Sequence, residues 1–246
     1  MNARVDIPET RLAADLSNQA IGQIAVELPG ATAVFRRLKL DFCCGGQISL
    51  RQAALDKGLD LDDVVGQLAA LRRSDELPAT VTASALIDHI LERYHAVHRE
   101  QLPELIRMAR RVEAVHRGHA DLPVGLADLL EQAQIELLDH MEKEETIIFP
   151  NLKAGGTAMV AYPIGIMRQE HTSHGAILEH LMALTNDAVP PAGACNTWRA
   201  LYAGVAQLGD DLINHIHLEN NVLFPPFEPK AAAGGCGTGA GCGCAG

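Results

Sequence analysis

The sequence has few aromatic residues, no long apolar run and no excess of positive charge. Phe, Trp and Tyr make up 4% of the 246 residues although 48% are hydrophobic, with many Ala and Leu. That composition favours a mainly helical protein. The 20 basic residues are outnumbered by 31 acidic ones, which gives a formal charge of −11. We therefore expect neither nucleic acid nor an acidic membrane as a partner.

The sequence also lacks the features of a membrane or secreted protein. No stretch of ~18 apolar residues occurs, and residues 1–17 do not have the basic and then apolar pattern of a signal peptide. The six cysteines form no spaced disulfide framework, because they comprise the adjacent Cys43 and Cys44, an isolated Cys195 and three in residues 231–246. We therefore expect a cytoplasmic protein with no membrane segment.

One motif occurs twice and predicts how the chain is organised. His140-x-x-x-Glu144 and His215-x-x-x-Glu219 are each followed by two apolar residues and Phe-Pro. Residues at positions i and i+4 lie on one face of an α-helix, so each copy can direct an imidazole and a carboxylate to one point. The shared ending indicates a duplicated half-site.

The duplication extends towards the N-terminus. His95-x-x-His98 precedes His140 by 45 residues, and His171-x-x-His174 precedes His215 by 44. Each half therefore predicts a helix with His-x-x-His, a loop and an antiparallel helix with His-x-x-x-Glu. Two such hairpins make an up-down four-helix bundle, which builds metal sites from inward-facing side chains. The predicted fold class is all-α.

The bundle is expected over residues 83–227, after a small helical unit (17–73) that carries Cys43 and Cys44. An N-terminal extension (1–16), a linker (74–82) and a tail (228–246) complete the layout. Residues 231–246 contain only Ala, Gly, Cys and Thr, so we interpret the tail as disordered or artefactual and assign it no function. Within the bundle we expect helices over about 82–116, 124–149, 163–185 and 195–224. Pro103 should kink or break the first, and the Pro of each Phe-Pro should end its helix.

The repeated spacing predicts a metal centre. A lone helical histidine is most often a surface or core residue, but here four His and two Glu recur at inward-facing positions. Imidazole and carboxylate ligands suit iron, manganese or zinc, and two glutamates can bridge two cations. The predicted ligands are His95, His140, Glu144, His171, His215 and Glu219.

Four further residues could support these ligands. His98 and His174 lie one helical turn after His95 and His171, where they could be outer partners or additional ligands. Glu136 and Glu170 could be outer carboxylates, although helical glutamates are usually just solvated. The other histidines are expected to be surface or structural residues.

The adjacent cysteines are the second chemical feature. Neighbouring cysteines close a disulfide only through a strained ring, so a structural bridge between Cys43 and Cys44 is not expected. The glycines that follow allow close approach of a partner. The thiols could bind iron transiently, exchange disulfides or be nitrosylated, or they could simply be small residues in a turn.

Taken together, these motifs make the chain resemble the iron–sulfur cluster repair proteins, also called regulators of cell morphogenesis and nitric-oxide signalling. The resemblance covers nearly all of residues 17–225 and rests on Asp41-Phe42-Cys43-Cys44-Gly45-Gly46, on residues 93–103 and on the two His-x-x-x-Glu copies. It implies a hemerythrin-like bundle with two non-haem iron ions and bridging carboxylates. Matched by motif, the implied ligands are the same six residues.

The resemblance favours a di-iron protein that repairs iron–sulfur clusters damaged by nitric oxide or oxidative stress, by supplying iron. The expected partners are damaged iron–sulfur proteins, with nitric oxide or oxygen as small ligands and a homodimer as one option. A di-iron nitric-oxide reductase or peroxidase is the first alternative, so whether the chain is an enzyme stays open. The second is a hemerythrin-like protein that binds or senses oxygen or nitric oxide.

Overall fold

The computed structural model describes residues 16–28, 31–71 and 82–228. Within those ranges the regular elements are helices, and the β contact there is an isolated antiparallel bridge between Ala20 and Ser49. The predicted all-α class is therefore confirmed. None of the described helices combines the length and hydrophobicity needed to cross a membrane.

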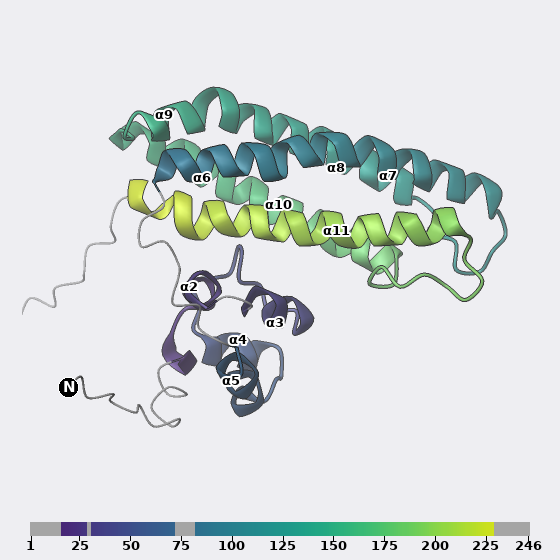
Figure 1. Cartoon of the computed structure of the whole chain (residues 1–246), viewed down its shortest axis with the longest axis horizontal. Helices are drawn as coiled ribbons and strands as arrows, with labels where there is room; N and C mark the ends of the chain where they lie inside the picture. The colour runs from purple at the N-terminus through teal and green to yellow at the C-terminus, as the bar shows by residue number, and fades with distance from the viewer. Residues whose placement is uncertain (1–15, 29–30, 72–81, 229–246) are drawn as a thin grey trace, which may run out of the picture.

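Four long helical segments lie side by side and form the bundle (Figure 1). Each buries an apolar face, and the core of the bundle includes Trp198, which is fully buried. The first segment begins at Thr82, whose side chain caps the helix by accepting a hydrogen bond from the Ala85 amide (3.2 Å). The segments are, in order, α6 (Ala83–Ile90), η1 (Leu91–His95) and α7 (Ala96–Val115); α8 (Leu126–Lys143), η2 (Glu144–Ile148) and α9 (Phe149–Lys153); η3 (Ala158–Val160) and α10 (Ala161–Leu184); and α11 (Asn196–Leu218), η4 (Glu219–Leu223) and η5 (Pro225–Phe227).

Three of these segments contain one turn of π-helix, namely η1, η2 and η4. A π-turn inserts a residue into the helical ladder and is frequent at functional sites. Here η1 ends at His95, η2 starts at Glu144 and η4 starts at Glu219. The π-turns thus coincide with predicted metal ligands. The i+4 spacing in the sequence did not indicate these turns.

Two prolines do not end their helices as expected. A break at Pro103 is wrong, because α7 runs through it from Ala96 to Val115, whereas a kink there stays a prediction. Pro150 does not end the second segment either, because it occupies the first turn of α9, which continues to Lys153. In the first turn of a helix a proline has no intrahelical hydrogen bond to lose. Near Pro225 the long helix does end, since η4 stops at Leu223.

Among its described residues, the N-terminal unit contains the four short helices α2 to α5 around its own apolar core. They are α2 (Ile21–Glu27), α3 (Ala31–Arg37), α4 (Leu50–Asp56) and α5 (Leu61–Ala69). Phe35, Phe42 and Leu50 are among the buried side chains of that core. Ser49 caps α4 and Asp60 caps α5.

This unit docks against the side of the bundle at α11 and η4 (Figure 1). The Phe42 ring meets the edge of the His217 ring, with centroids 5.1 Å apart. At the rim Arg36 pairs with Asp210 (3.3 Å), and Lys39 pairs with Asp187 (2.9 Å). The loop with Cys43 and Cys44 packs on the core of the bundle. Exposed pairs contribute little, so apolar contacts and the hydrogen bonds of that loop hold the interface.

The docking is close enough to require glycine at position 22. A Cβ atom there would lie 2.7 Å from Asn221 Oδ1 and 3.0 Å from the Gly46 carbonyl oxygen. We therefore expect Gly22→Ala to lower the free energy of unfolding by about 1–3 kcal/mol, as other overpacked sites do. Urea unfolding followed by circular dichroism measures the effect.

Gly66 offers the matched control. It also lies inside a short helix of the unit, but a Cβ atom there would meet nothing within 4 Å. Gly66→Ala should raise the free energy of unfolding by up to about 1 kcal/mol. Equal effects of the two substitutions would contradict the close packing at Gly22.

The expected extension, linker and tail fall almost wholly outside the described residues, so their boundaries stay predictions. The tail residues 231–246, with Cys236, Cys242 and Cys244, lie outside them too. Glu228, which we assigned to the tail, instead accepts hydrogen bonds from Arg168 of α10, each 2.8 Å long. At that residue the chain is still attached to the bundle.

Candidate metal centre

The six predicted ligands converge in the interior of the bundle. Each is at most 1% exposed, which is unusual for ionisable side chains without a binding role. All four helical segments contribute: His95 comes from the first, His140 and Glu144 from the second, His171 from the third, and His215 and Glu219 from the fourth.

The side chains form two groups that could each hold a metal ion. His95 and His215 belong to the first group, and His140 and His171 to the second, while Glu144 and Glu219 belong to both. In each group the ligating atoms lie within 4.8 Å of one another. Each cation position therefore takes one histidine from each half of the sequence, so neither half-site is complete alone.

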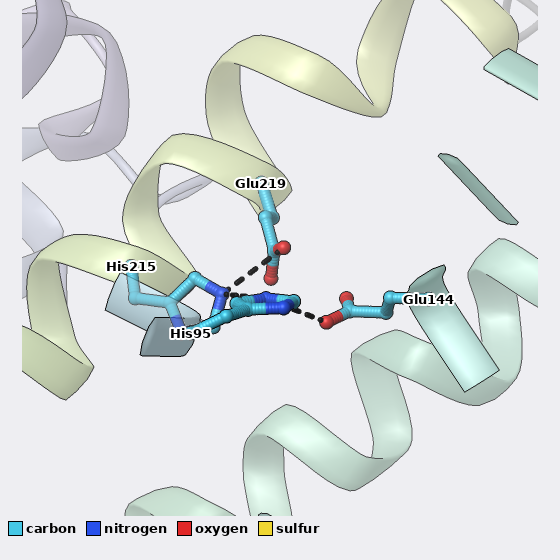
Figure 2. A group of neighbouring side chains, drawn as sticks. All are labelled: His95, Glu144, His215 and Glu219. Carbon is cyan, nitrogen blue, oxygen red and sulfur yellow. Dashed lines mark hydrogen bonds and ion pairs between the residues drawn. The ribbon is translucent and has the colours of Figure 1, made fainter. Parts of the chain in front are cut away.

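Figure 2 shows the first group, with two imidazoles and two carboxylates facing one another. His95 Nε2 lies 3.2 Å from His215 Nε2 and 3.4 Å from Glu144 Oε2. His215 Nε2 lies 3.2 Å from Glu219 Oε1. Two imidazole nitrogens at this distance cannot both carry a proton, because the two hydrogens would clash. When neither is protonated, the lone pairs of His95 Nε2 and His215 Nε2 can bind one cation.

The second group repeats this arrangement with the other carboxylate oxygens. His140 Nε2 lies 3.0 Å from His171 Nε2 and 3.3 Å from Glu144 Oε1. His171 Nε2 lies 3.1 Å from Glu219 Oε2. Each glutamate thus directs one oxygen to each group, which is the arrangement of a carboxylate that bridges two cations.

These residues fit a two-metal centre on two observations. Neither Glu144 oxygen has a hydrogen-bond partner, nor has Glu219 Oε2, although all are buried. Buried carboxylate oxygens without donors are costly unless a cation lies beside them. The spacings also match, because adjacent ligands of an octahedral ion with bonds of about 2.1 Å lie ~3 Å apart.

The outer nitrogens of the four histidines have unequal partners. His95 Nδ1 lies 2.7 Å from Glu145 Oε1, and His140 Nδ1 lies 2.7 Å from Glu170 Oε2. The two glutamates are themselves held, by Arg99 at 2.8 Å and Lys143 at 2.7 Å. A carboxylate behind an imidazole fixes its tautomer and raises its basicity as a ligand.

The remaining two histidines have no carboxylate behind them. His171 Nδ1 lies 2.9 Å from Asn220 Oδ1, and His215 Nδ1 has no hydrogen-bond partner. His215 is oriented instead by the Tyr94 ring, which stacks on it at 5.3 Å and 3°. Each cation position therefore has one carboxylate-backed histidine and one that is not.

The Phe of each Phe-Pro ending packs on a ligand of its own half. Phe149 lies 5.6 Å from the His95 ring, and Phe224 is parallel to the His171 ring at 6.1 Å. This contact explains why the apolar ending recurs with the His-x-x-x-Glu motif. The rings close the side of the centre that faces the core formed with α6 and α9.

The charges of the centre compensate one another. Burial alone would raise the pKa of Glu144, but His140 and His95 outweigh it and hold that pKa well below its usual range. Burial opposes a charge on His140 as well, yet Glu144, Glu219 and Glu170 raise its pKa to about 9. Both glutamates, 144 and 219, are thus held as carboxylates, the form that binds cations.

His98 and His174 lie next to the centre but make no hydrogen bond to its ligands. His98 is fully buried, neither ring nitrogen has a partner, and its ring lies 5.6 Å from that of His215. His174 lies 4.8 Å from the His140 ring. Burial lowers the pKa of His98 to about 2 and that of His174 to about 3, so both imidazoles are neutral. Neither His98 nor His174 therefore has the outer hydrogen-bonding role that the sequence suggested for it.

A small apolar cavity of about 20 Å³ adjoins His174. Leu102, Leu137 and Leu178 are among the side chains that line it, and His174 is its one titratable residue. That volume is sufficient for one water-sized molecule, and an apolar lining favours a nonpolar diatomic molecule over water.

The structure separates the two carboxylates considered as outer partners. Glu170 contacts His140, whereas Glu136 accepts a hydrogen bond from Gln132 one turn away (2.9 Å), and no bond between Glu136 and the centre occurs among the described residues. Two partners were missed, Glu145 and Asn220. Both directly follow a glutamate that belongs to both groups, and the π-turns that start at Glu144 and Glu219 turn them towards the candidate ligands.

Cys43 and Cys44 are free, partly buried thiols in the loop between α3 and α4. The Cys43 thiol lies 3.8 Å from the Cys44 sulfur and 3.3 Å from Asp41 Oδ1. Its interaction with Cys44 and its burial raise the pKa of Cys43. The loop can therefore offer two adjacent thiols, and Cys43 becomes a thiolate only when something displaces its proton.

Removing a carboxylate behind one histidine should weaken one cation position. Glu145→Gln keeps the shape of the side chain but removes the charge that His95 and Arg99 contact. We expect the affinity of the His95–His215 position to fall about 10–100-fold. Competition with a chelator for the bound metal measures it. Glu142→Gln is the control, because Glu142 is exposed in the same helical segment, and an equal loss there would contradict the assignment.

Comparison with known proteins adds two family matches. Residues 86–227 match the hemerythrin HHE cation binding domain, and residues 17–72 match a domain of unknown function, DUF542. The chain is 45% identical over 214 residues to a probable iron-sulfur cluster repair protein of Haemophilus influenzae, covering 85% of this chain and 96% of that protein.

Two further relatives are both named iron-sulfur cluster repair protein YtfE. The chain is 48% identical over 211 residues to the iron-sulfur cluster repair protein YtfE of Pectobacterium atrosepticum, covering 85% of this chain and 96% of the relative. It is 47% identical over 214 residues to YtfE of Yersinia pseudotuberculosis, covering 86% of this chain and 97% of that protein. The similarity therefore extends over both the small helical unit and the bundle.

Proposed function

Because this chain belongs to the iron–sulfur cluster repair protein family, we propose that it holds two non-haem iron ions and supplies iron to damaged iron–sulfur proteins. The observation that carries the proposal is the pair of glutamates, each of which directs one oxygen to one cation position and its other oxygen to the second position. Iron is the metal because two neighbouring imidazole and carboxylate sites suit it and because its delivery is what cluster repair requires.

The protein side chains would hold the ions without enclosing them. Four histidines and two shared carboxylates provide four ligand groups at each position, fewer than the six of an octahedral ion. When bound, the iron pair would supply exchangeable coordination positions and redox-active cations. A site with open positions can release its metal more readily than a closed one.

Each part of the shell has a role in holding and releasing the cargo. The carboxylates behind His95 and His140 keep those imidazoles oriented with Nε2 towards the cations. The bridging glutamates contact no donor besides the ligand imidazoles, so no other bond has to break when a carboxylate shifts from one cation to the other. An iron ion that leaves is the cargo, and the protein's ligands remain in place for the next.

We place the delivery step at the loop with Cys43 and Cys44. The loop packs on the bundle and is anchored beside η4, the segment that carries Glu219. Thiolates are good transient ligands for iron, so the loop would receive the ion or contact the client protein. The partly exposed thiols are accessible for either task.

The test is a comparison of stoichiometric transfer with turnover. The protein loaded with iron is mixed with a [4Fe–4S] protein whose cluster nitric oxide has damaged, and client activity is followed over time. We expect recovery in proportion to the iron supplied, saturating when the bound iron is spent. Recovery that does not depend on the iron bound to the chain would contradict the proposal.

The apolar cavity beside His174 supports a second candidate, binding of nitric oxide or oxygen at the centre. A diatomic molecule in that cavity would lie next to a neutral imidazole and close to His140. If an electron donor sustains many turnovers per chain, the protein is a nitric-oxide reductase or peroxidase and not only a binding protein. A steady-state assay with dithionite and nitric oxide separates the two, because iron supply predicts no sustained consumption.

The remaining expectations concern location and assembly. We propose that the protein works in the cytoplasm, because Cys43, Cys44 and the exposed Cys195 are free thiols, which reducing compartments preserve. A homodimer stays a prediction that sedimentation equilibrium checks.

A further inference from the structure

The amide of Asn220 contacts a metal-ligand histidine and the cysteine loop at the same time. Its Oδ1 lies 2.9 Å from His171 Nδ1, and its Nδ2 donates a hydrogen bond of 3.1 Å to the Cys43 carbonyl oxygen. Asn220 is 2% exposed, so water does not compete for either bond. One side chain thus connects the N-terminal unit to the candidate metal centre.

The orientation of this amide follows from its neighbours. His171 Nε2 faces the cation position, so Nδ1 carries the proton and needs an acceptor, which must be Oδ1. The amide nitrogen is then the end that faces the Cys43 carbonyl, which accepts only from a donor. Both contacts are satisfied in one orientation, and flipping the amide would lose both.

Other contacts hold both ends of this connection. Asn221 donates to the Phe42 and Cys43 carbonyls at 3.3 and 3.2 Å. Arg168 donates to the Asn220 carbonyl at 2.8 Å and fixes the backbone of η4. Within the loop, Asp41 accepts from the Cys44 and Gly45 amides at 2.9 and 3.0 Å, which fixes the turn that presents the Cys43 carbonyl.

The connection reaches only one of the two cation positions. At the His140–His171 position, the histidine without a carboxylate depends on Asn220, and through it on the loop. At the other position, the corresponding histidine is His215, whose Nδ1 has no partner and whose ring rests on Tyr94. Among the described contacts, none connects that position to the loop by hydrogen bonds.

From this asymmetry we infer that Asn220 is a positioning residue through which the Cys43–Cys44 loop controls metal retention at the His140–His171 position alone. Under the proposed function, a client that binds the loop would draw the Cys43 carbonyl away from Asn220, so that His171 loses its oriented acceptor and that position releases its cation first. The cation held by His95 and His215 stays. The protein would therefore deliver one iron of the pair, the one at the His140–His171 position that Asn220 connects to the loop.

The experiment measures the release of both irons from the purified, loaded full-length chain to an excess of a coloured iron chelator. Two phases are expected, and the glutamates behind the histidines assign them. Glu170→Gln should accelerate the phase of the His140–His171 position, and Glu145→Gln should accelerate the other. Asn220→Ala should accelerate the release phase of the His140–His171 position about 10–100-fold and leave the other phase unchanged.

A double-mutant cycle then tests the connection itself. Asp41→Ala removes the carboxylate that fixes the loop, without touching the centre, and should accelerate the same phase several-fold. In the Asn220→Ala background it should have no further effect. Asp60→Ala is the matched control, because Asp60 also accepts two backbone amides in the N-terminal unit, but at the start of α5 instead of in the loop.

Three results would overturn the inference: Asp41→Ala leaves both phases unchanged, it accelerates both equally, or its effect persists without the Asn220 amide. If Asn220→Ala does not fold, comparing Asp41→Ala with Asp60→Ala still tests whether the loop controls metal release, because neither residue lies in the bundle. A chain that fails to hold two irons overturns this inference and the proposed function together. Failure to reactivate a client overturns the proposed function alone, because release to the chelator involves no client.

Discussion

A chain with Glu144 and Glu219 both replaced by Gln will lose both iron ions and keep its helices. Each glutamate directs one oxygen to each of the two cation positions, so the double substitution removes both carboxylates from both positions. A Gln amide also directs N–H donors at imidazole nitrogens that are needed as ligands. Each single variant should retain less iron than the parent and show weaker magnetic coupling between the remaining ions.

Metal analysis, Mössbauer spectra and far-ultraviolet circular dichroism measure these effects together. Glu136→Gln is the control, since Glu136 lies on the same helix as His140 and accepts its hydrogen bond from Gln132 rather than from a ligand of the centre. It should retain all of its iron. Full iron retention with unchanged spectra in the double variant would remove both glutamates from the centre.

Replacing Cys43 and Cys44 by Ser should leave the metal centre intact and slow iron delivery. All six candidate ligands lie in the bundle, and Asn220 contacts the carbonyl of Cys43, which serine retains. The double variant should therefore keep two irons and the parent spectrum. Serine hydroxyls are poor ligands for iron compared with thiolates, so reactivation of a damaged client should slow about tenfold or more.

Cys195→Ser is the matched control, because Cys195 is an exposed free thiol outside the loop. Client activity at equal iron loading is followed for the parent, the double variant and this control. Equal rates for all three would show that the cysteine pair has no part in delivery. Loss of iron from the double variant would show instead that holding and delivery are not separate.

The bundle and the convergence of the six side chains were predictable because the signal is periodic. His-x-x-x-Glu places two side chains on one helical face, and the 45- and 44-residue separations place the copies at corresponding heights in an up-down bundle. A helix is rigid over that distance, so spacing in the sequence becomes position in space.

The parts that were missed depend on local departures from a regular helix. The π-turns at Glu144 and Glu219 change which residues face inwards, so Glu145 and Asn220 reach ligand histidines. Nothing in the composition marks a π-turn, and the apparent stop at Pro150 concealed the continuation of its helix to Lys153. The choice of Glu170 over Glu136 was equally out of reach, because both are helical glutamates near a histidine.

The docking of the N-terminal unit was inaccessible for a different reason. The Asn221 contacts with the carbonyls of Phe42 and Cys43 join residues about 180 positions apart, which no local pattern encodes. Asn220 and Asn221 follow Glu219 in the sequence as two ordinary polar residues. Only the packed structure shows that they connect the loop to the bundle.

Iron labelling tests the central claim most directly. The chain is loaded with ⁵⁷Fe, separated from free metal, and incubated with an unlabelled [4Fe–4S] protein damaged by nitric oxide. The client is then isolated, and its Mössbauer spectrum is recorded. Supply of iron by this chain predicts ⁵⁷Fe in the rebuilt cluster, in proportion to the ⁵⁷Fe that the chain has lost. A client that regains its cluster without the label, while the chain keeps its ⁵⁷Fe, would contradict the account.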